Sequence, residues 1–188
     1  MINFSVVDKS WTLFLDRDGV INEDKVGSYI FNKKEFFFTP GAKEAIKTFS
    51  NIFGVIVIVT NQRGVGKGLM TQQDLDEIHT YMLDEIKRAG GRIDKIYYCT
   101  DTNDDSPNRK PMPGMAWQAK ADFPEIDFTK SIMVGNKLSD MQFGKNIDAK
   151  TVFIPSTNPE TLFPHPLINE RVESLFELSK RFPSLIKS

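Results

Sequence analysis

Two aspartates follow an apolar segment at a spacing that suits phosphoryl chemistry. Asp16 and Asp18 come directly after the apolar residues 13–15 and are followed by Gly19. Hiding both carboxylates in a strand interior would carry a large desolvation cost, so they need a cation or a reaction. One carboxylate could attack phosphorus, while the second protonates the leaving oxygen and later activates water. By themselves these residues would equally suit a solvated acidic turn.

Three further polar residues lie where they could serve the same reaction. Thr60 follows a β-branched run and offers a hydroxyl and a backbone N–H to a phosphoryl oxygen, and Lys110 offers a positive charge against the developing negative charge. Asn136 opens a polar loop after another apolar run. Nucleophile, acid–base partner, hydroxyl, lysine and metal-binding loop in this order indicate phosphoryl transfer, with Asp16 as the nucleophile and Asp18 as the acid–base partner.

Short β-branched runs alternate with helical patterns along the chain. Five strands are expected, at residues 11–15, 55–59, 93–99, 131–134 and 151–154. Helices are expected at residues 41–53 and 71–89, and Thr71 with Asp74 forms a capping box that opens the second. This alternation predicts an α/β fold with a mostly parallel sheet and helices on both faces. Ligands of such sheets bind beyond the carboxyl ends of the strands, where the polar residues above would lie.

The length of the chain favours one compact domain. The 188 residues allow one sizeable core but would leave two domains cramped, so we expect a single domain over residues 1–188. Its motif-bearing core would span residues 11–154. A C-terminal helical tail would span residues 155–188 and contain an amphipathic helix from about residue 168 to residue 182. The segments between the motifs are too short to form a large cap domain.

The composition indicates which classes of binding partner the protein can have. A formal net charge of −1 gives no global field to attract nucleic acid or an anionic membrane. The single cysteine, Cys99, cannot form an internal disulfide and is interpreted as a buried small hydrophobe, and no signal peptide or long apolar span is visible. We therefore expect a cytoplasmic monomer whose partner is a small phosphorylated metabolite, with neither nucleic acid nor membrane as a partner.

Taken together, the motifs resemble those of the haloacid dehalogenase-type (HAD) phosphatases. Within that superfamily the chain is most similar to the heptose-bisphosphate and histidinol-phosphate phosphatases. Four segments carry the resemblance: FLDRDGVIN at residues 14–22, TNQRGVGKG at 60–68, RKPMPGM at 109–115 and VGNKLSDM at 134–141.

The resemblance implies a fold and a set of roles. The fold is a three-layer Rossmann-like α/β fold with strand order 3-2-1-4-5. Mg²⁺ would be held by Asp16, the main chain of Asp18 and the Asn136 position, while Thr60 and Lys110 would stabilise the phosphoryl group. The residues implied to contact substrate are Asp24, Asn61, Gln62, Arg63, Arg109 and Lys137.

The sequence departs from the family pattern at two places. Asn136 stands where the family usually has aspartate; its amide oxygen can still ligate Mg²⁺ but brings no charge, which Asp140 could restore through a water. Residues 100–108 lack the Cys and His cluster of the zinc-bearing members, so no zinc is expected. The first departure leaves a catalytically silent, phosphometabolite-binding protein as an alternative.

The substrate expected for an open site of this kind is small, polar and phosphorylated. Specificity would come from the loops at residues 23–38, 63–70 and 100–112. Heptose 1,7-bisphosphate is the first choice and histidinol phosphate the second. The Thr-Asn-Gln-x-Gly turn also resembles that of polynucleotide 3′-phosphatases, but the near-neutral charge argues against a nucleic-acid substrate.

Overall fold

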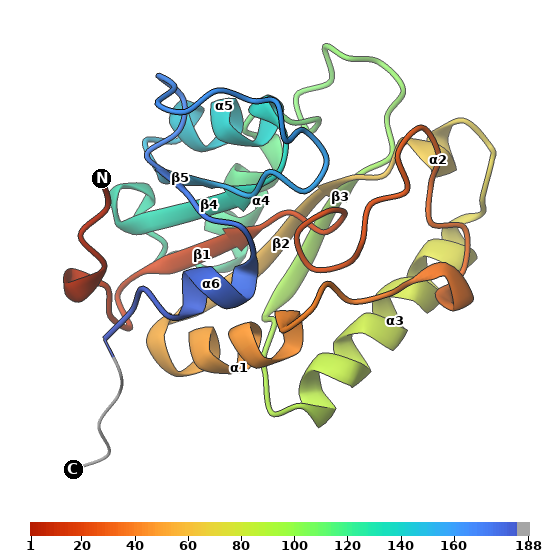
Figure 1. Cartoon of the computed structure of the whole chain (residues 1–188). Helices are drawn as coiled ribbons and strands as arrows, with labels where there is room; N and C mark the ends of the chain where they lie inside the picture. Colours follow the sequence, from red (N-terminus) through yellow and green to blue (C-terminus); the bar gives the residue numbers. More distant parts are fainter. Residues whose placement is uncertain (184–188) are drawn as a thin grey trace.

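The computed structural model describes residues 1–183 and contains a six-stranded sheet with helices on both faces (Figure 1). The strands lie in the order β3-β2-β1-β4-β5-β6, and every neighbouring pair is parallel. Their bounds are Thr12–Leu15 (β1), Val55–Asn61 (β2), Lys95–Cys99 (β3), Ser131–Gly135 (β4), Lys150–Phe153 (β5) and Glu170–Arg171 (β6). The predicted order 3-2-1-4-5 is confirmed, and β6 adds a strand that was not expected.

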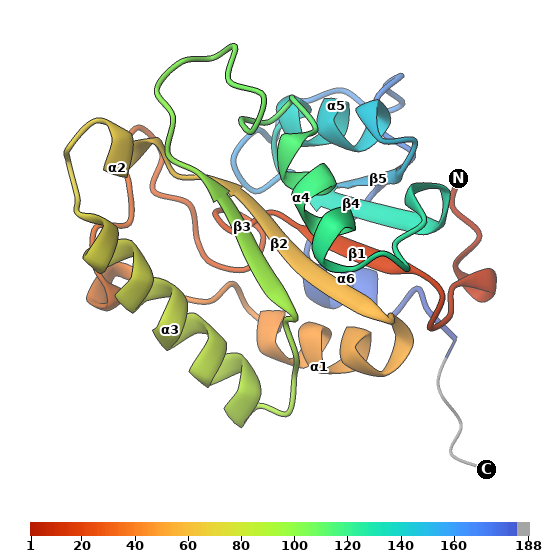
Figure 2. The same ribbon diagram turned by 180° about the vertical axis from the view of Figure 1, so that it is seen from behind.

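Helices cover both faces of the sheet (Figures 1 and 2). On one face lie α1 (Ala42–Ile52), α3 (Gln72–Arg88) and α6 (Leu175–Ser179), and on the other lie α4 (Gly114–Asp122) and α5 (Leu138–Asn146). A single turn, α2 (Arg63–Gly66), follows β2, and 3₁₀ turns lie at Phe4–Val6, Lys33–Glu35 and Phe128–Lys130. The helices predicted at residues 41–53 and 71–89 are confirmed, and the Thr71 capping box opens α3.

The central strands are buried on both sides. Leu13 and Leu15 pack into the cluster that α1 and α3 complete, whereas Phe14 packs into the cluster under α4 and α5. A strand alternates its side chains between faces, so an unbroken apolar run fits only a sheet covered on both sides. The register pairs Leu15 with Ile58 of β2 and with Val134 of β4. The polar residues that follow β1, β2 and β4 therefore share one edge of the sheet.

The C-terminal segment differs from the prediction. The prediction of one helix from about residue 168 to residue 182 is wrong, because the chain forms the short strand β6 and then the five-residue helix α6. β6 pairs with the edge of β5, and Val172 donates its N–H to the Phe153 carbonyl at 3.1 Å. This pairing overrides the helical spacing of the apolar side chains. The helix begins only where the Ser174 hydroxyl accepts the Glu177 N–H at 3.1 Å.

The loops at the carboxyl edge of the sheet carry little regular structure. The chain between β1 and α1 carries a single 3₁₀ turn, and a loop without regular structure joins β3 to α4. Within residues 1–183 no large cap domain is present. In the same part of the chain, no helix combines the length and the hydropathy needed to cross a bilayer. The tail expected at residues 155–188 is described as far as residue 183.

Phe182 anchors the C-terminal segment to the core. Its ring packs against Phe4, Phe53 and Phe49 at centroid distances of 5.0, 5.5 and 5.7 Å. We expect Phe182→Ala to lower the free energy of unfolding by about 3 kcal/mol, because truncating a buried aromatic ring leaves a cavity. Urea denaturation would measure the loss of unfolding free energy. The matched control is Leu162→Ala, which shortens an exposed side chain. Equal midpoints for the two variants would show that the segment is not part of the core.

Candidate active site

A pocket of about 800 Å³ opens at the carboxyl ends of the central strands. Eight of the residues predicted from the sequence line it: Asp16, Asp18, Thr60, Asn61, Arg63, Arg109, Lys110 and Lys137. Tyr29, from the loop before α1, and Lys67, at the end of α2, also line the pocket. The other predicted residues, Asp24, Gln62 and Asn136, lie outside the pocket lining.

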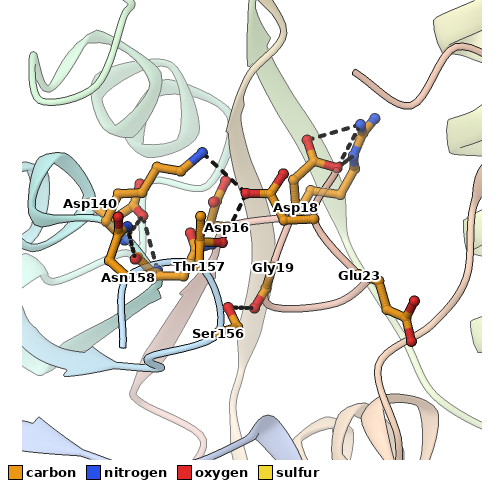
Figure 3. A network of polar contacts seen from close by, with 12 residues as sticks. Asp16, Asp18, Gly19, Glu23, Asp140, Ser156, Thr157 and Asn158 are labelled. Atoms are coloured by element: carbon orange, nitrogen blue, oxygen red, sulfur yellow. Dashed lines mark hydrogen bonds and ion pairs between the residues drawn. The ribbon is translucent and has the colours of Figure 1, made fainter. Parts of the chain in front are cut away.

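A buried lysine lies between two carboxylates at this pocket (Figure 3). Lys110 Nζ is 2.8 Å from Asp16 and 2.7 Å from Asp140, and none of the three side chains is more than 9% exposed. The second oxygen of Asp140 accepts the backbone N–H groups of Asn136 and Lys137 at 3.1 and 3.0 Å. Asp140 is therefore the partner of Lys110 and the cap of α5. Its role as a source of charge for a metal through a water stays a prediction.

The pKa values of this cluster follow from burial and pairing. Burial raises the pKa of Asp16 to about 6, although the neighbouring Lys110 ammonium lowers it. Burial alone would lower the pKa of Lys110, but the Asp140 and Asp16 carboxylates raise it. At neutral pH Asp16 is thus an ionised, poorly solvated carboxylate beside a fixed positive charge. An oxygen nucleophile that attacks phosphorus needs this combination.

Three neighbouring side chains hold the carboxylate of Asp18. Arg17 Nη2 donates to both carboxylate oxygens at 2.9 and 3.0 Å, and the amides of Asn22 and Gln62 each donate at 2.9 Å. Burial would raise the pKa of Asp18, yet the Arg17 charge and the amide donors lower it. The carboxylate is a stable anion in this position.

Arg17 is fully buried and has a second partner that the sequence did not reveal. Its Nη1 lies 3.2 Å from Nε2 of His79, a residue of α3 that is 62 positions away in the chain. A guanidinium group only donates, so Nε2 accepts and the imidazole is neutral. Burial and the Arg17 charge accordingly lower the pKa of His79 to about 3. No local pattern marks this pair, because only the packing of α3 on the sheet brings it together.

The turn after β2 holds other residues of the site in place through hydrogen bonds. Gln62 is buried and donates to the Thr60 hydroxyl at 2.9 Å as well as to Asp18. Asn61 forms two hydrogen bonds with the main chain of Lys110, accepting its N–H at 3.1 Å and donating to its carbonyl at 3.2 Å. Both residues were predicted to contact substrate. The structure places Gln62 behind Thr60 and Asp18, while Asn61 holds the lysine loop and lines the pocket.

Two arginines at the pocket share one carboxylate. Asp104 pairs with Arg63 and, at 3.0 Å, with Nε of Arg109. One buried nitrogen of each arginine, Nε of Arg63 and Nη1 of Arg109, has no hydrogen-bond partner within the described part of the chain. Guanidinium groups that line a pocket are suited to a phosphate or another planar or tetrahedral anion.

The last residue of β3, Cys99, lies in the core. Its side chain is buried, and burial raises the pKa of the thiol. The interpretation of Cys99 as a small buried hydrophobe is therefore confirmed. Across residues 1–183, no three side chains of the His, Cys, Asp and Glu types lie close enough together to hold a metal ion.

The amide oxygen of Asn136 could act as a metal ligand that is not a carboxylate, thiolate or imidazole. Asn136 is fully buried, and its Oδ1 has no hydrogen-bond partner among the described residues. Its amide lies against Gly19, which has φ +80° and where a Cβ would come within 2.0 Å of Asn136 Nδ2. An orphaned carbonyl oxygen after β4, at the edge of the sheet where Asp16 and Asp18 follow β1, fits a hard cation such as Mg²⁺, which prefers oxygen ligands.

Comparison with known proteins adds to this geometry. The family described as polynucleotide kinase 3 phosphatase matches residues 12–158. A D-glycero-alpha-D-manno-heptose-1,7-bisphosphate 7-phosphatase of Mycobacterium tuberculosis is 39% identical over 140 residues, 74% of either chain. A D-glycero-D-manno-heptose-1,7-bisphosphate 7-phosphatase of Chlorobaculum tepidum is 32% identical over 189 residues, covering 94% of this chain and 88% of the relative.

A solved structure matches almost the whole molecule. The D,D-heptose 1,7-bisphosphate phosphatase from B. bronchiseptica, complexed with magnesium and phosphate, gives a TM-score of 0.82 at 28% identity and covers 91% of this chain and 97% of that one. The fold and the paired aspartates after β1 define a phosphatase of the α/β class. The chain belongs to the haloacid dehalogenase-type phosphatases, in the family described as polynucleotide kinase 3 phosphatase.

The neutral state of His79 predicts a dependence of stability on pH. Its pKa is about 3 in the folded protein, against about 6.5 in an unfolded chain. Below pH 6.5 only the unfolded chain takes up this proton, so stability falls as the pH falls. We expect His79→Gln, whose amide oxygen can still accept from Arg17, to reduce the stability lost between pH 7 and pH 5 by roughly 2 kcal/mol.

Urea unfolding at the two pH values would measure this difference. The matched control is His165→Gln, because His165 is the other of the two histidines of the chain and lies outside the site. It should keep the full loss seen in the wild type. If His79→Gln and His165→Gln lose stability equally, the neutral imidazole is not the group responsible.

Proposed function

We propose that this protein removes the 7-phosphate of a D-glycero-D-manno-heptose 1,7-bisphosphate, in a reaction that passes through an aspartyl-phosphate. The observation that carries the proposal is the Lys110 ammonium held between Asp16 and Asp140 in a pocket that Asp18 also lines. The relatives named for this activity, at 32% and 39% identity, support the choice of substrate.

In the proposed reaction, Asp16 attacks phosphorus and the bond from phosphorus to the sugar oxygen breaks. Asp18, in its protonated form, gives a proton to that leaving oxygen. It then takes a proton from a water, which attacks phosphorus, breaks the bond to Asp16 and releases phosphate. Lys110 and the Thr60 hydroxyl stabilise the negative charge on the phosphoryl oxygens throughout.

Mg²⁺ is the proposed cofactor. Asp16, the main-chain carbonyl of Asp18 and Asn136 Oδ1 would hold it, and the related structure complexed with magnesium and phosphate supports this assignment. When bound, the ion would draw negative charge from the phosphoryl oxygens and help to orient them. The buried Asn136 meets the requirement for an oxygen ligand without adding a negative charge.

The second phosphate of the substrate is assigned to the basic side of the pocket. Arg63, Arg109 and Lys137 line this side of the pocket and would bind it through their positive charges. Asp104 would then share the two guanidinium groups with the incoming phosphate. Asp24 lies outside this lining, so we do not assign it a contact with substrate.

A polynucleotide 3′-phosphatase is the second candidate, because the matching family carries that description. Neutralising several nucleic-acid phosphates makes binding weaken steeply with salt. Binding to a nicked duplex that falls by about a thousandfold or more between 50 and 200 mM salt would favour this candidate. A formal net charge of −1 argues for the small substrate.

The roles of Asp16 and Asp18 are tested by isosteric amides. Asp16→Asn should abolish hydrolysis with Mg²⁺ present, because an amide cannot attack phosphorus. Asp18→Asn should lose activity most for esters whose leaving oxygen is weakly acidic, because these need protonation most, with typical losses of about 10²–10⁴-fold. Rates on aryl and alkyl phosphates, with and without EDTA, together with circular dichroism, give the answer. Near-wild-type turnover by a folded Asp16→Asn protein would remove the nucleophile assignment.

The assignment of the second phosphate is tested at Arg109. We expect Arg109→Gln to lower kcat/KM for the heptose bisphosphate by about 10- to 100-fold, as the loss of a charge-assisted hydrogen bond implies. The value for a heptose monophosphate should change much less. Arg88→Gln, at an exposed helix position outside the pocket, is the matched control. Equal losses on the two substrates would place Arg109 outside the second-phosphate site.

A further inference from the structure

A chain of three hydrogen-bonding groups runs from Asp24 to the orphaned oxygen of Asn136. The Thr157 hydroxyl donates to Asp24 Oδ2 at 2.8 Å, and Asn136 Nδ2 donates to the same hydroxyl oxygen at 2.5 Å. Lys137 Nζ lies 3.5 Å from that Asp24 oxygen. None of these contacts involves the reacting atoms, and the proposed catalytic roles use neither Thr157 nor Asp24.

The direction of each bond follows from the chemistry of the groups. A carboxylate only accepts, so the single hydroxyl proton of Thr157 is committed to Asp24. The hydroxyl oxygen can then only accept from Asn136, which requires the amide NH₂ to face Thr157. Oδ1 must therefore face the other way. An amide has two chemically opposite ends, and this chain of bonds selects between them.

The selected end is the one that remains without a partner. Asn136 is fully buried, and Oδ1 contacts no donor within residues 1–183, although buried carbonyl oxygens are almost always paired. If the amide turned over, its NH₂ would occupy that place and repel a cation. A carboxylate at this position would need no such selection, because its two oxygens are equivalent.

The segment that supplies Thr157 is itself tied to the ligand loop. Ser156 donates to the Gly19 carbonyl at 2.5 Å, and Asn158 donates its amide to the Asn136 carbonyl at 3.0 Å. Figure 3 shows Ser156 beside Gly19, and Thr157 and Asn158 near Asp16 and Asp140. Thr157 is therefore held in register with Asn136 by neighbours on both sides, as a residue that orients a ligand must be.

We propose that Thr157 and Asp24 are positioning residues that turn the Asn136 amide so that its oxygen faces a divalent cation. The inference rests on the proposed function, because the cation is the Mg²⁺ assigned there. It accounts for an uncharged ligand where a carboxylate would be the simpler choice: the hydrogen-bonded chain supplies the orientation that the amide by itself lacks. Residues that orient metal ligands typically change metal affinity by about 10- to 100-fold when they are replaced.

The test measures cation binding without substrate or turnover. Mn²⁺, a spectroscopic substitute for Mg²⁺, is titrated into the whole protein, and the free aqua ion is followed by electron paramagnetic resonance. Thr157→Val keeps the shape but removes the hydroxyl, and we expect it to raise the Kd for Mn²⁺ about 10-fold or more. Thr157→Ser keeps the hydroxyl and should bind Mn²⁺ like the wild type. Asp24→Asn, which offers Thr157 a donor and frees its proton, should weaken binding as Thr157→Val does.

A second background separates orientation from packing. In Asn136→Asp the ligand is a carboxylate, so adding Thr157→Val should leave the Kd nearly unchanged. If Thr157→Val weakens binding equally in both backgrounds, the hydroxyl acts through packing and the proposal is wrong. It is also wrong if folded Thr157→Val binds Mn²⁺ as the wild type does. A wild-type protein that binds no Mn²⁺ would remove the metal assignment itself, and this inference with it. Melting temperatures of each variant confirm that the protein is folded.

Discussion

The ion cluster around Lys110 is the interaction on which the rest of the site depends. One ammonium group joins Asp16, which follows β1, to Asp140, which opens α5, across 94 residues of sequence in the first case. Burying such charges carries a desolvation penalty of several kcal/mol per ion, so close pairing and the N–H groups at Asp140 are needed to make the cluster tolerable. Because of this penalty, the cluster adds little to the free energy of unfolding. Its consequence is that the Asp16 carboxylate is poorly solvated at an open pocket.

The two aspartates after β1 acquire opposite properties from their surroundings. Burial raises the pKa of Asp16, whereas the Arg17 charge and the amide donors lower that of Asp18 against the effect of burial. Environments that separate two carboxylates in this way allow them to take different parts in one reaction. The separation depends on Arg17, which is fully buried and in turn needs the neutral His79 as an acceptor. A helix on the face of the sheet thus bears on the chemistry at its edge.

Loops around the pocket are tied together by polar contacts. Asp104 joins Arg63 of α2 to Arg109 beside the lysine, and Asn61 holds the main chain of Lys110. The segment after β5 is fixed to the aspartate loop through the bond from Ser156 to Gly19. Because these contacts run between loops, the site keeps its shape without a large cap domain within residues 1–183.

The sequence by itself determined a mostly parallel α/β sheet, both long helices and the residues at the carboxyl ends of the strands, because alternating apolar patterns and polar residues after strands are local signals. The order of the strands came from the resemblance to the HAD phosphatases. Asp16 and Thr60 were found from the local signals, and Lys110 was found by its positive charge. The tertiary structure decided what those residues contact. It paired Asp140 with Lys110, placed Gln62 behind Thr60, and joined Arg17 to His79 and Asn136 to Thr157. It also paired β6 with the edge of β5 where apolar spacing had indicated a helix. Such contacts join distant segments and depend on which lone pairs and protons remain unused after folding, which no local pattern records.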